Sequence, residues 1–171
     1  KPAGYVTTVS DPGGRRKVTD LLRGVRQRVY PVGRLDYDTE GLLLLTNDGE
    51  LTYALTHPSQ GIPKTYLARV RGVPSPDKLA TLSRGVLLAD GPTAPARVKL
   101  VDSGDGAGVL KITVHEGKNR QIRRMCEHIG HPVQHLRRVS VGPLQLDGLG
   151  PGQYRHLASR EVSRLKKMAK L

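Results

Sequence analysis

The sequence predicts an α+β fold with a mostly antiparallel, mixed sheet and flanking helices. Short runs of alternating apolar and polar residues outnumber the helical patterns, and Gly, Pro or Asp bounds most of these runs. Tight turns join several runs, which suits neighbouring antiparallel strands. No repeat, low-complexity tract or long linker divides the 171 residues. We therefore expect one domain over residues 1–171.

Seven segments have the alternation and the boundaries expected of strands. They are residues 5–9, 42–46, 64–70, 96–101, 109–115, 135–141 and 154–157. Because Phe and Trp are absent, the core must be built from Leu, Val, Ile and Ala.

Four segments predict helices: residues 49–56, 76–84, 119–129 and 160–170. The second has the clearest boundaries, because Ser75 can cap its start, Pro76 suits its first turn and Gly85 follows its last.

The third predicted helix has one apolar face, and Gly130 follows it. The face consists of Ile122, Met125, Cys126 and Ile129. On a helical wheel Arg123 lies closer to this face than Arg120 or Arg124. We therefore expect Arg123 to reach inward to a buried carboxylate, while the other two arginines point to solvent or RNA.

The charge balance is strongly basic. Lys and Arg number 28 against 15 Asp and Glu, which gives a net charge of +13 and a pI near 10.3. Such a field attracts polyanions, so nucleic acid is the predicted partner. The alternative is a basic surface that serves solubility, but such surfaces usually intersperse both signs.

Cysteine content and hydropathy indicate the compartment. The single Cys126 excludes an internal disulfide and a Cys-based metal cluster, which favours a reduced intracellular setting. No apolar stretch approaches the roughly 20 residues that span a bilayer, and no leader pattern opens the chain. We expect a cytoplasmic protein with no membrane contact, and a monomer by default.

Three carboxylates, Asp36, Asp38 and Glu40, cluster in a polar run before an apolar stretch. Gly33 and Gly41 bound this run and permit sharp turns, which predicts a rigid loop at a sheet edge, where functional groups are often placed. The alternative is that all three carboxylates only cap turns or the element that follows.

A second polar segment, residues 116–125, leads into the third predicted helix. The helix start presents free backbone N–H groups, and Lys118, Arg120 and Arg124 add positive charge, which together predict a phosphate cradle. The alternative is a solvated basic face.

The alternation of residues 64–71 turns Tyr66 inward, where it serves as core or stacks on an unpaired base. His128, His131 and His135 span a helix end and a turn without convergent partners, so we expect no metal site.

Together these motifs resemble one branch of the bacterial ribosomal-RNA pseudouridine synthases. The branch comprises synthase A, which acts on small-subunit RNA, and synthases B, E and F, which act on large-subunit RNA. Residues 1–4 (KPAG) resemble the first family motif, residues 33–36 (GRLD) with 41–49 the second, and 64–66 (KTY) the tyrosine motif. Residues 116–125 and 136–142 resemble the third motif and its sequel. The likeness extends over nearly the whole chain and is nearest to the synthase B type.

The resemblance implies the pseudouridine synthase fold with a central active-site cleft, and specific roles for three residues. Asp36 would be the catalytic aspartate, Tyr66 the tyrosine that stacks on the base, and Arg123 the ion-pair partner of the aspartate. Leu136 would line the apolar pocket, a role that Ile112 could fill instead.

Further residues are expected to contact RNA. Those expected to bind the substrate are Arg34, Lys64, Lys118, Asn119, Arg120, Gln121, Arg124 and Leu136. Those expected to contact the RNA backbone are Arg15, Arg16 and Lys17, in a flexible loop, and Arg137 and Arg138. Backbone contacts of this kind add salt dependence rather than sequence preference.

The resemblance implies isomerisation of a uridine in ribosomal RNA, most closely the large-subunit RNA, without a cofactor or metal. Relatives in this branch carry an S4-type RNA-binding domain before the first motif, so we expect a catalytic domain truncated at its N-terminus. Two alternatives stay open: a non-catalytic RNA-binding or ribosome-assembly protein, and a nucleoside-cleaving hydrolase that uses two loop carboxylates.

Overall fold

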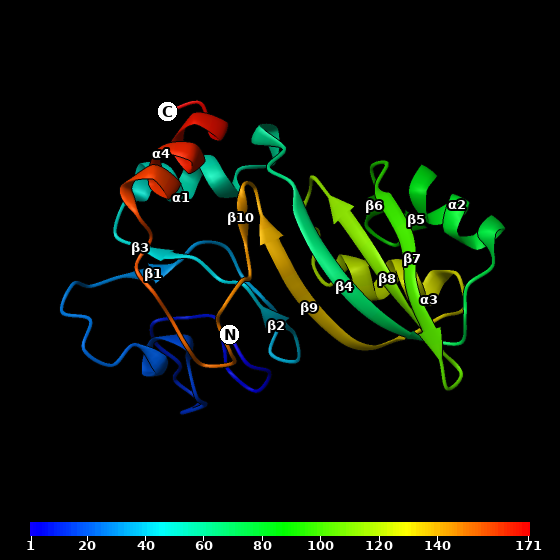
Figure 1. The fold of residues 1–171 in the computed structure, drawn as a ribbon, viewed down its shortest axis with the longest axis horizontal. Helices are drawn as coiled ribbons and strands as arrows, with labels where there is room; N and C mark the ends of the chain where they lie inside the picture. The colour runs from blue at the N-terminus through cyan, green and yellow to red at the C-terminus, as the bar shows by residue number, and fades with distance from the viewer. The chain divides into compact units, whose positions relative to one another are not determined.

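A computed structural model describes residues 1–171, and the chain forms two compact units. The first unit joins Lys1–Ile62 with Ser140–Leu171, and the second is Pro63–Val139. The helices and strands of both are labelled in Figure 1. Whether the two units act as a single domain stays a prediction.

The second unit is built on an antiparallel sheet. Its strands are β4 (Lys64–Arg71), β7 (Arg97–Gly104), β8 (Ala107–Val114) and β9 (Val133–Val141), in the order β9-β4-β8-β7. β8 pairs with β4 along its whole length and with β7 on its other side. The last two residues of β9 belong to the first unit. The predicted α+β class with a mostly antiparallel sheet is confirmed.

Helices α2 (Pro76–Arg84) and α3 (Gln121–His128) supply the core of the second unit from one face of this sheet. Alternate strand residues such as Ala68, Leu110 and Ile112 pack there against Leu82 and Met125, and all five are fully buried. A short hairpin, β5 (Leu87–Leu88) and β6 (Gly91–Pro92), follows α2.

The caps of α2 and α3 are those expected from the sequence. The Ser75 hydroxyl accepts from the backbone N–H of Lys78 at 3.3 Å, and Pro76 opens α2. Gly85 ends α2 with a φ of +97°, and a Cβ there would collide with the Thr93 carbonyl, so only glycine fits. Gly130 follows α3 with a φ of +82°.

The first unit combines short strands with two helices. The helices are α1 (Gly49–Thr56) and α4 (Ser159–Met168), and the unit also contains the short 3-10 turns η1 (Val18–Leu21) and η2 (Pro58–Gln60). The strands are β1 (Tyr30–Pro31), β2 (Glu40–Gly41), β3 (Leu45–Thr46) and β10 (Leu144–Gln145); β1 pairs with β3, and β10 pairs with the end of β9. Its core packs Leu51, Leu55, Val141 and Leu165.

Two predicted strands are wrong, and a third is correct only at its end. Residues 5–9 form only one isolated bridge, Val6 to Lys17, because no extended partner lies beside them. Residues 42–46 keep only their last two positions as β3. Residues 154–157 form no strand; instead the Tyr154 hydroxyl donates to the Arg23 carbonyl, which ties this segment to a loop.

Candidate functional site

The polar run that contains Asp36 forms a tight loop in the first unit. Gly33 and Gly41 have positive φ values of 71° and 126°, and the N–H of Thr39 donates to the carbonyl of Asp36 at 3.0 Å. Leu35 and Thr39 are buried, whereas Asp36 is half-buried. The loop is therefore anchored by two buried residues and leaves Asp36 partly open to solvent.

Lys1 holds this loop by hydrogen bonds to the backbone of the loop. Its ammonium donates to the carbonyl oxygens of Pro2, Asp36 and Thr39 at 3.1, 3.0 and 2.5 Å. The backbone N–H of Gly41 donates to the Lys1 carbonyl at 3.0 Å, and the Lys1 nitrogen donates back to the Gly41 carbonyl at 2.8 Å. Both ends of the carboxylate run are thus fixed by one residue.

Burial and the carboxylates of the loop act on the pKa of the Lys1 ammonium in opposite directions. Burial lowers its pKa from 10.5 to about 8, and the negative charges of Asp38, Asp36 and Glu40 oppose that shift. Sequence reasoning assigned no role to Lys1 beyond its place in the first motif. Its place in that motif was the only signal for it in the sequence.

Thr7 and Gly4 complete the support. The Thr7 hydroxyl donates to the Leu35 carbonyl at 2.6 Å and accepts from the Leu35 N–H at 3.2 Å, and it is buried. The N–H of Gly4 donates to the Tyr37 carbonyl at 2.8 Å. Thr7 lies in a segment that was predicted as a strand. Instead of facing a neighbouring strand, its side chain bonds to the backbone of the Asp36 loop.

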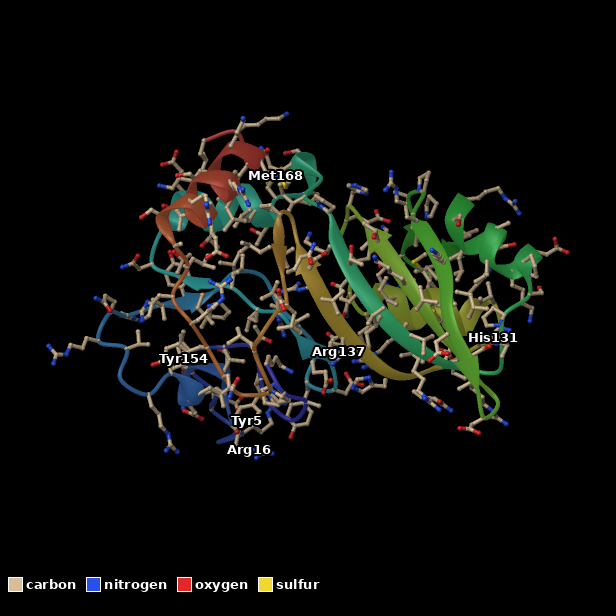
Figure 2. All side chains as sticks on the ribbon, in the orientation of Figure 1. Tyr5, Arg16, His131, Arg137, Tyr154 and Met168 are labelled. Carbon is tan, nitrogen blue, oxygen red and sulfur yellow. The ribbon has the colours of Figure 1, made fainter.

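The basic residues near this loop are engaged within the protein. Arg15 pairs with Asp11 at 3.2 Å and lies 6.0 Å from the centre of the Tyr37 ring. Arg16 lies over the Tyr5 ring at 4.8 Å, and both are labelled in Figure 2. Lys17 pairs with Asp20 at 2.8 Å. Each of the three side chains thus has an intramolecular contact, and the flexibility of this segment stays a prediction. Arg34 is exposed.

Tyr66 lies on β4 in the second unit, with its ring partly buried against the core, as its strand position predicts. Its cross-strand partner is Ile112, and Leu136 belongs to the same cluster. Both residues named as apolar pocket candidates are thus buried in the cluster that contacts the tyrosine.

Two more of the predicted residues lie close to each other in the second unit. Burial lowers the pKa of Lys64, and the positive charge of Arg138 lowers it further. Arg138 is only 5% exposed, which leaves its guanidinium little surface to offer an RNA backbone. Arg137 is exposed on β9, where Figure 2 labels it, so the expected backbone contact suits Arg137 better.

The segment before α3 is held by side chains. The Gln121 amide donates to the Glu116 carboxylate at 2.9 Å, and its oxygen accepts from the Lys118 N–H at 3.0 Å. The same Glu116 oxygen accepts from the Ala94 N–H at 2.7 Å. Gln121 is buried. The structure thus gives Gln121 a positioning role, and a direct contact with substrate stays a prediction.

The arginines at the start of α3 differ in their surroundings. Arg120 is exposed in the left-handed region, with a φ of 48°, and Arg123 is half-buried. Arg124 donates through both terminal nitrogens to Asp90 on the β5–β6 turn, at 2.8 and 3.1 Å. Hydrogen bonding to Arg124 lowers the pKa of Asp90. This pair neutralises the positive charge that Arg124 would offer to a phosphate. Asn119 is exposed and Lys118 half-buried.

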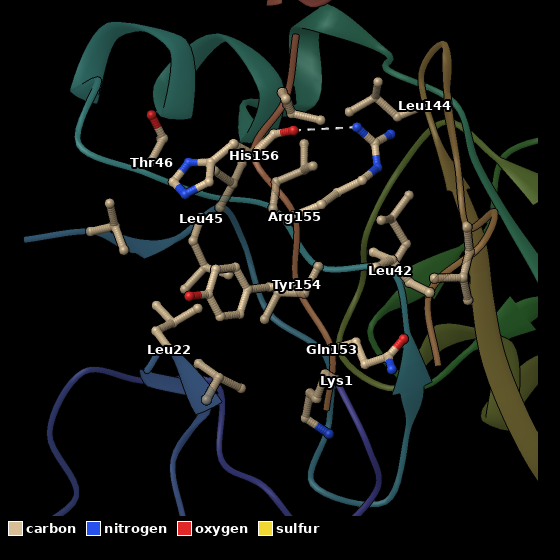
Figure 3. A pocket seen from close by; sticks show the side chains of 18 of the residues that line it. Lys1, Leu22, Leu42, Leu45, Thr46, Leu144, Gln153, Tyr154, Arg155 and His156 are labelled. Carbon is tan, nitrogen blue, oxygen red and sulfur yellow. Dashed lines mark hydrogen bonds between the residues drawn. The ribbon is translucent and has the colours of Figure 1, made fainter. Parts of the chain in front are cut away.

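An apolar cavity of about 470 Å³ lies in the first unit (Figure 3). Leucines are the commonest residues of its lining, and polar residues such as Lys1, Asp48 and Arg155 also border it. Neither Asp36 nor Arg34 lines it. Because none of the three carboxylates of the Asp36 loop lines it, it is not the candidate active site.

The predicted site residues are therefore divided between the two units. Asp36, Arg34 and residues 15–17 belong to the first, whereas Tyr66, Arg123 and the other predicted contacts belong to the second. No group of His, Cys, Asp and Glu could hold a metal ion. No helix is both long and apolar enough to cross a membrane.

Comparison with known proteins identifies the family. Residues 1–128 match the model of the family described as RNA pseudouridylate synthase. The chain is 48% identical over 171 residues to ribosomal large subunit pseudouridine synthase B of Bacillus subtilis, covering 99% of this chain and 70% of that protein. It is 41% identical to ribosomal large subunit pseudouridine synthase E of Xanthomonas campestris, covering 95% of each.

A solved structure has the same fold. The crystal structure of a pseudouridylate synthase matches with a TM-score of 0.88 and 31% identity, over 96% of this chain and 70% of that one. The predicted fold family is thereby confirmed.

Proposed function

We propose that this chain, which belongs to the RNA pseudouridylate synthase family, isomerises a specific uridine of large-subunit ribosomal RNA to pseudouridine. The observation that supports this choice of substrate is the 48% identity, over 99% of the chain, to an enzyme named for the large ribosomal subunit. The family is one of isomerases, which favours an enzyme over the non-catalytic RNA-binding alternative.

The reaction sets the requirements for the site. The N1–C1′ bond of uridine breaks, the uracil turns, and a C5–C1′ bond forms while C5 loses a proton and N1 gains one. Atoms and electrons balance within the nucleotide and water, so the proposal needs no cofactor. We assign Asp36 as the group that acts on the sugar or the base, in its ionised form.

The support of the Asp36 loop suits that role. A carboxylate that must meet a reacting atom has to be held in position, and the loop is fixed through its backbone by Lys1 and Thr7. Arg123 stays the proposed ion-pair partner of Asp36, the role that the resemblance implies for it.

Tyr66 is proposed to stack on the flipped uracil. The target base must leave its helix or loop at a cost of a few kcal/mol, which stacking and phosphate contacts offset. The partly buried ring, set against Ile112, has few orientations to lose when the base arrives. Leu136 and Lys64 are proposed to border the same base.

The remaining predicted residues are proposed to bind the RNA. Exposed cations such as Arg34, Arg120 and Arg137 suit phosphate contacts, and Arg124 joins them once it leaves Asp90. We further propose that the chain acts as a monomer in the cytoplasm, where its ribosomal substrate is assembled.

The test is to incubate the chain with unmodified large- and small-subunit RNA and to map pseudouridine by carbodiimide modification and primer extension. We expect one new stop in the large-subunit RNA and none in the small-subunit RNA. A stop only in the small-subunit RNA would overturn the substrate. Free uracil with an abasic site would instead establish the hydrolase alternative, since isomerisation leaves the mass of the RNA unchanged.

A further inference from the structure

The sheet of the second unit has one covered and one open face. Tyr66, Ala68 and Val70 of β4 point to the face on which α2 and α3 pack. Figure 1 shows α3 behind β4 and β8, with no helix in front of these strands. Because side chains alternate along a strand, Leu67, Arg69 and Arg71 project from the open face.

The open face is strongly basic. β8 contributes Lys111 to it, directly opposite Leu67 of β4, and β7 contributes Lys99 and Arg97. The basic sheet face consists of five exposed cations, Arg69, Arg71, Arg97, Lys99 and Lys111. None of them is paired with a carboxylate. Asp102 is the one acidic residue that these three strands contribute to the face.

The register sets two of these cations against each other. Lys99 lies directly opposite Lys111 in the β7–β8 ladder, and like charges at facing positions destabilise a sheet. Lysines on an edge strand such as β7 are also used to block sheet-to-sheet aggregation. That role does not account for Lys111 or Arg69, because β8 and β4 are paired on both sides.

We propose that the basic sheet face binds the phosphate backbone of the RNA that flanks the target uridine. This inference rests on the proposed function, because it takes RNA as the substrate. A polyanion laid across β4, β8 and β7 would relieve the repulsion between Lys99 and Lys111. Tyr66 lies on the opposite face of the same sheet, so RNA that reaches the basic sheet face extends well beyond the reacting nucleotide.

The proposal predicts a dependence on RNA length. A Lys99→Gln/Lys111→Gln double variant should bind a transcript of complete large-subunit RNA about tenfold more weakly than the wild type. The slope of log affinity against log salt should fall by about 1.4 to 1.8, since each lost phosphate contact removes about 0.7 to 0.9. Short hairpin transcripts cut from the same RNA should bind both proteins equally.

The matched control is a Lys78→Gln/Arg84→Gln variant, which removes two exposed cations from α2 and keeps the same net charge as the test variant. It should leave the salt slope for the complete RNA unchanged. Equal effects of the two double variants, or equal losses on long and short RNA, would overturn the proposal. Circular dichroism of all three proteins separates lost contacts from lost folding.

Release of tritium from [5-³H]uridine in the same RNA separates this inference from the proposed function. If the wild type releases tritium and the test variant binds normally, the inference is wrong and the function stands. If no protein releases tritium while the test variant alone binds the long RNA weakly, the function is wrong and the RNA-binding face stands.

Discussion

The two polar motifs of the chain are held in different ways. The Asp36 loop is fixed through its backbone, because Lys1 and Thr7 bond to its carbonyl and amide groups. The segment before α3 is fixed through its own side chains, with Gln121 and Glu116 bonded to each other and to backbone. Polar residues in a sequence motif thus include both scaffold and substrate contacts, and the motif alone does not separate them.

This difference has a measurable consequence. Where the support lies outside the motif, a change in the motif itself should affect chemistry and leave stability intact. Where the motif supports itself, a change in it should lower stability first and activity as a result.

The largest effect is expected at Asp36. An Asp36→Asn variant should lose at least about a thousandfold in single-turnover rate, the scale seen when a reacting group is removed, with an unchanged urea midpoint. Asp38→Asn makes the same charge change at an exposed position of the same loop. It should stay within about tenfold of the wild type. A comparable loss in both variants would mean that the loop acts by charge and not through one reacting carboxylate.

Gln121→Leu should reduce stability next. The change removes a buried amide and leaves the half-buried Lys118 N–H and Glu116 carboxylate each short of a partner. The expected loss is about 2 to 4 kcal/mol in the free energy of unfolding, measured with urea. Glu127→Gln, at an exposed position on the same helix, is the control and should change the free energy of unfolding little. A fully stable Gln121→Leu protein with weakened RNA binding would instead make Gln121 a substrate contact.

Lys1→Met should lower the free energy of unfolding by about 1 to 2 kcal/mol, because four carbonyl oxygens lose their donor while a poorly solvated charge is also removed. The stability of the wild type should also depend on pH through this group. The pKa of Lys1 is lowered from 10.5 to about 8 in the folded protein, so the unfolded chain binds more protons between these values. Its contribution to stability therefore rises with pH across that window.

The variant lacks this titration. Subtracting its stability from that of the wild type at each pH isolates the group, and a difference that stays flat from pH 8 to 10.5 would show that the Lys1 ammonium is as well solvated in the folded protein as in the unfolded chain.

Asp90→Asn should have the smallest effect. Removing the carboxylate releases Arg124, so affinity for RNA should rise a few-fold and the salt slope should steepen by about 0.7 to 0.9. Asp105→Asn removes one exposed negative charge from the β7–β8 turn and is the control. Because Arg124 lowers the pKa of Asp90 below 3.8, the pair stabilises the protein above that pH and is lost as pH falls through the lowered value. Equal gains in both variants would rule out a role for Arg124.

Local signals in the sequence predicted part of the fold well. The bounds of α1 and α2 match the prediction to the residue, and α3 lies within two residues of it. Caps at Ser75, Gly85 and Gly130 supplied these boundaries. The two-residue strands could not be predicted, because two positions carry no period. The first unit could not be predicted either, because it joins residues 1–62 to residues 140–171 through contacts distant in sequence.

The candidate site was predicted only in part for a related reason. Alternation correctly turned Tyr66 toward the core, and the helical wheel correctly placed Ile122 and Met125 there. The ion pair between Arg124 and Asp90 joins residues 34 positions apart, and the bonds from Lys1 to the Asp36 loop span a similar distance in sequence. Periodicity reports which face a residue occupies and is silent about its partners across the chain.

The most direct test of the account is tritium release from large-subunit RNA labelled with [5-³H]uridine, compared for the wild type and Asp36→Asn. The wild type should release one equivalent of tritium per pseudouridine formed, with no free uracil, and the variant should bind the RNA but release none. Equal release by both proteins, or release of uracil, would contradict it.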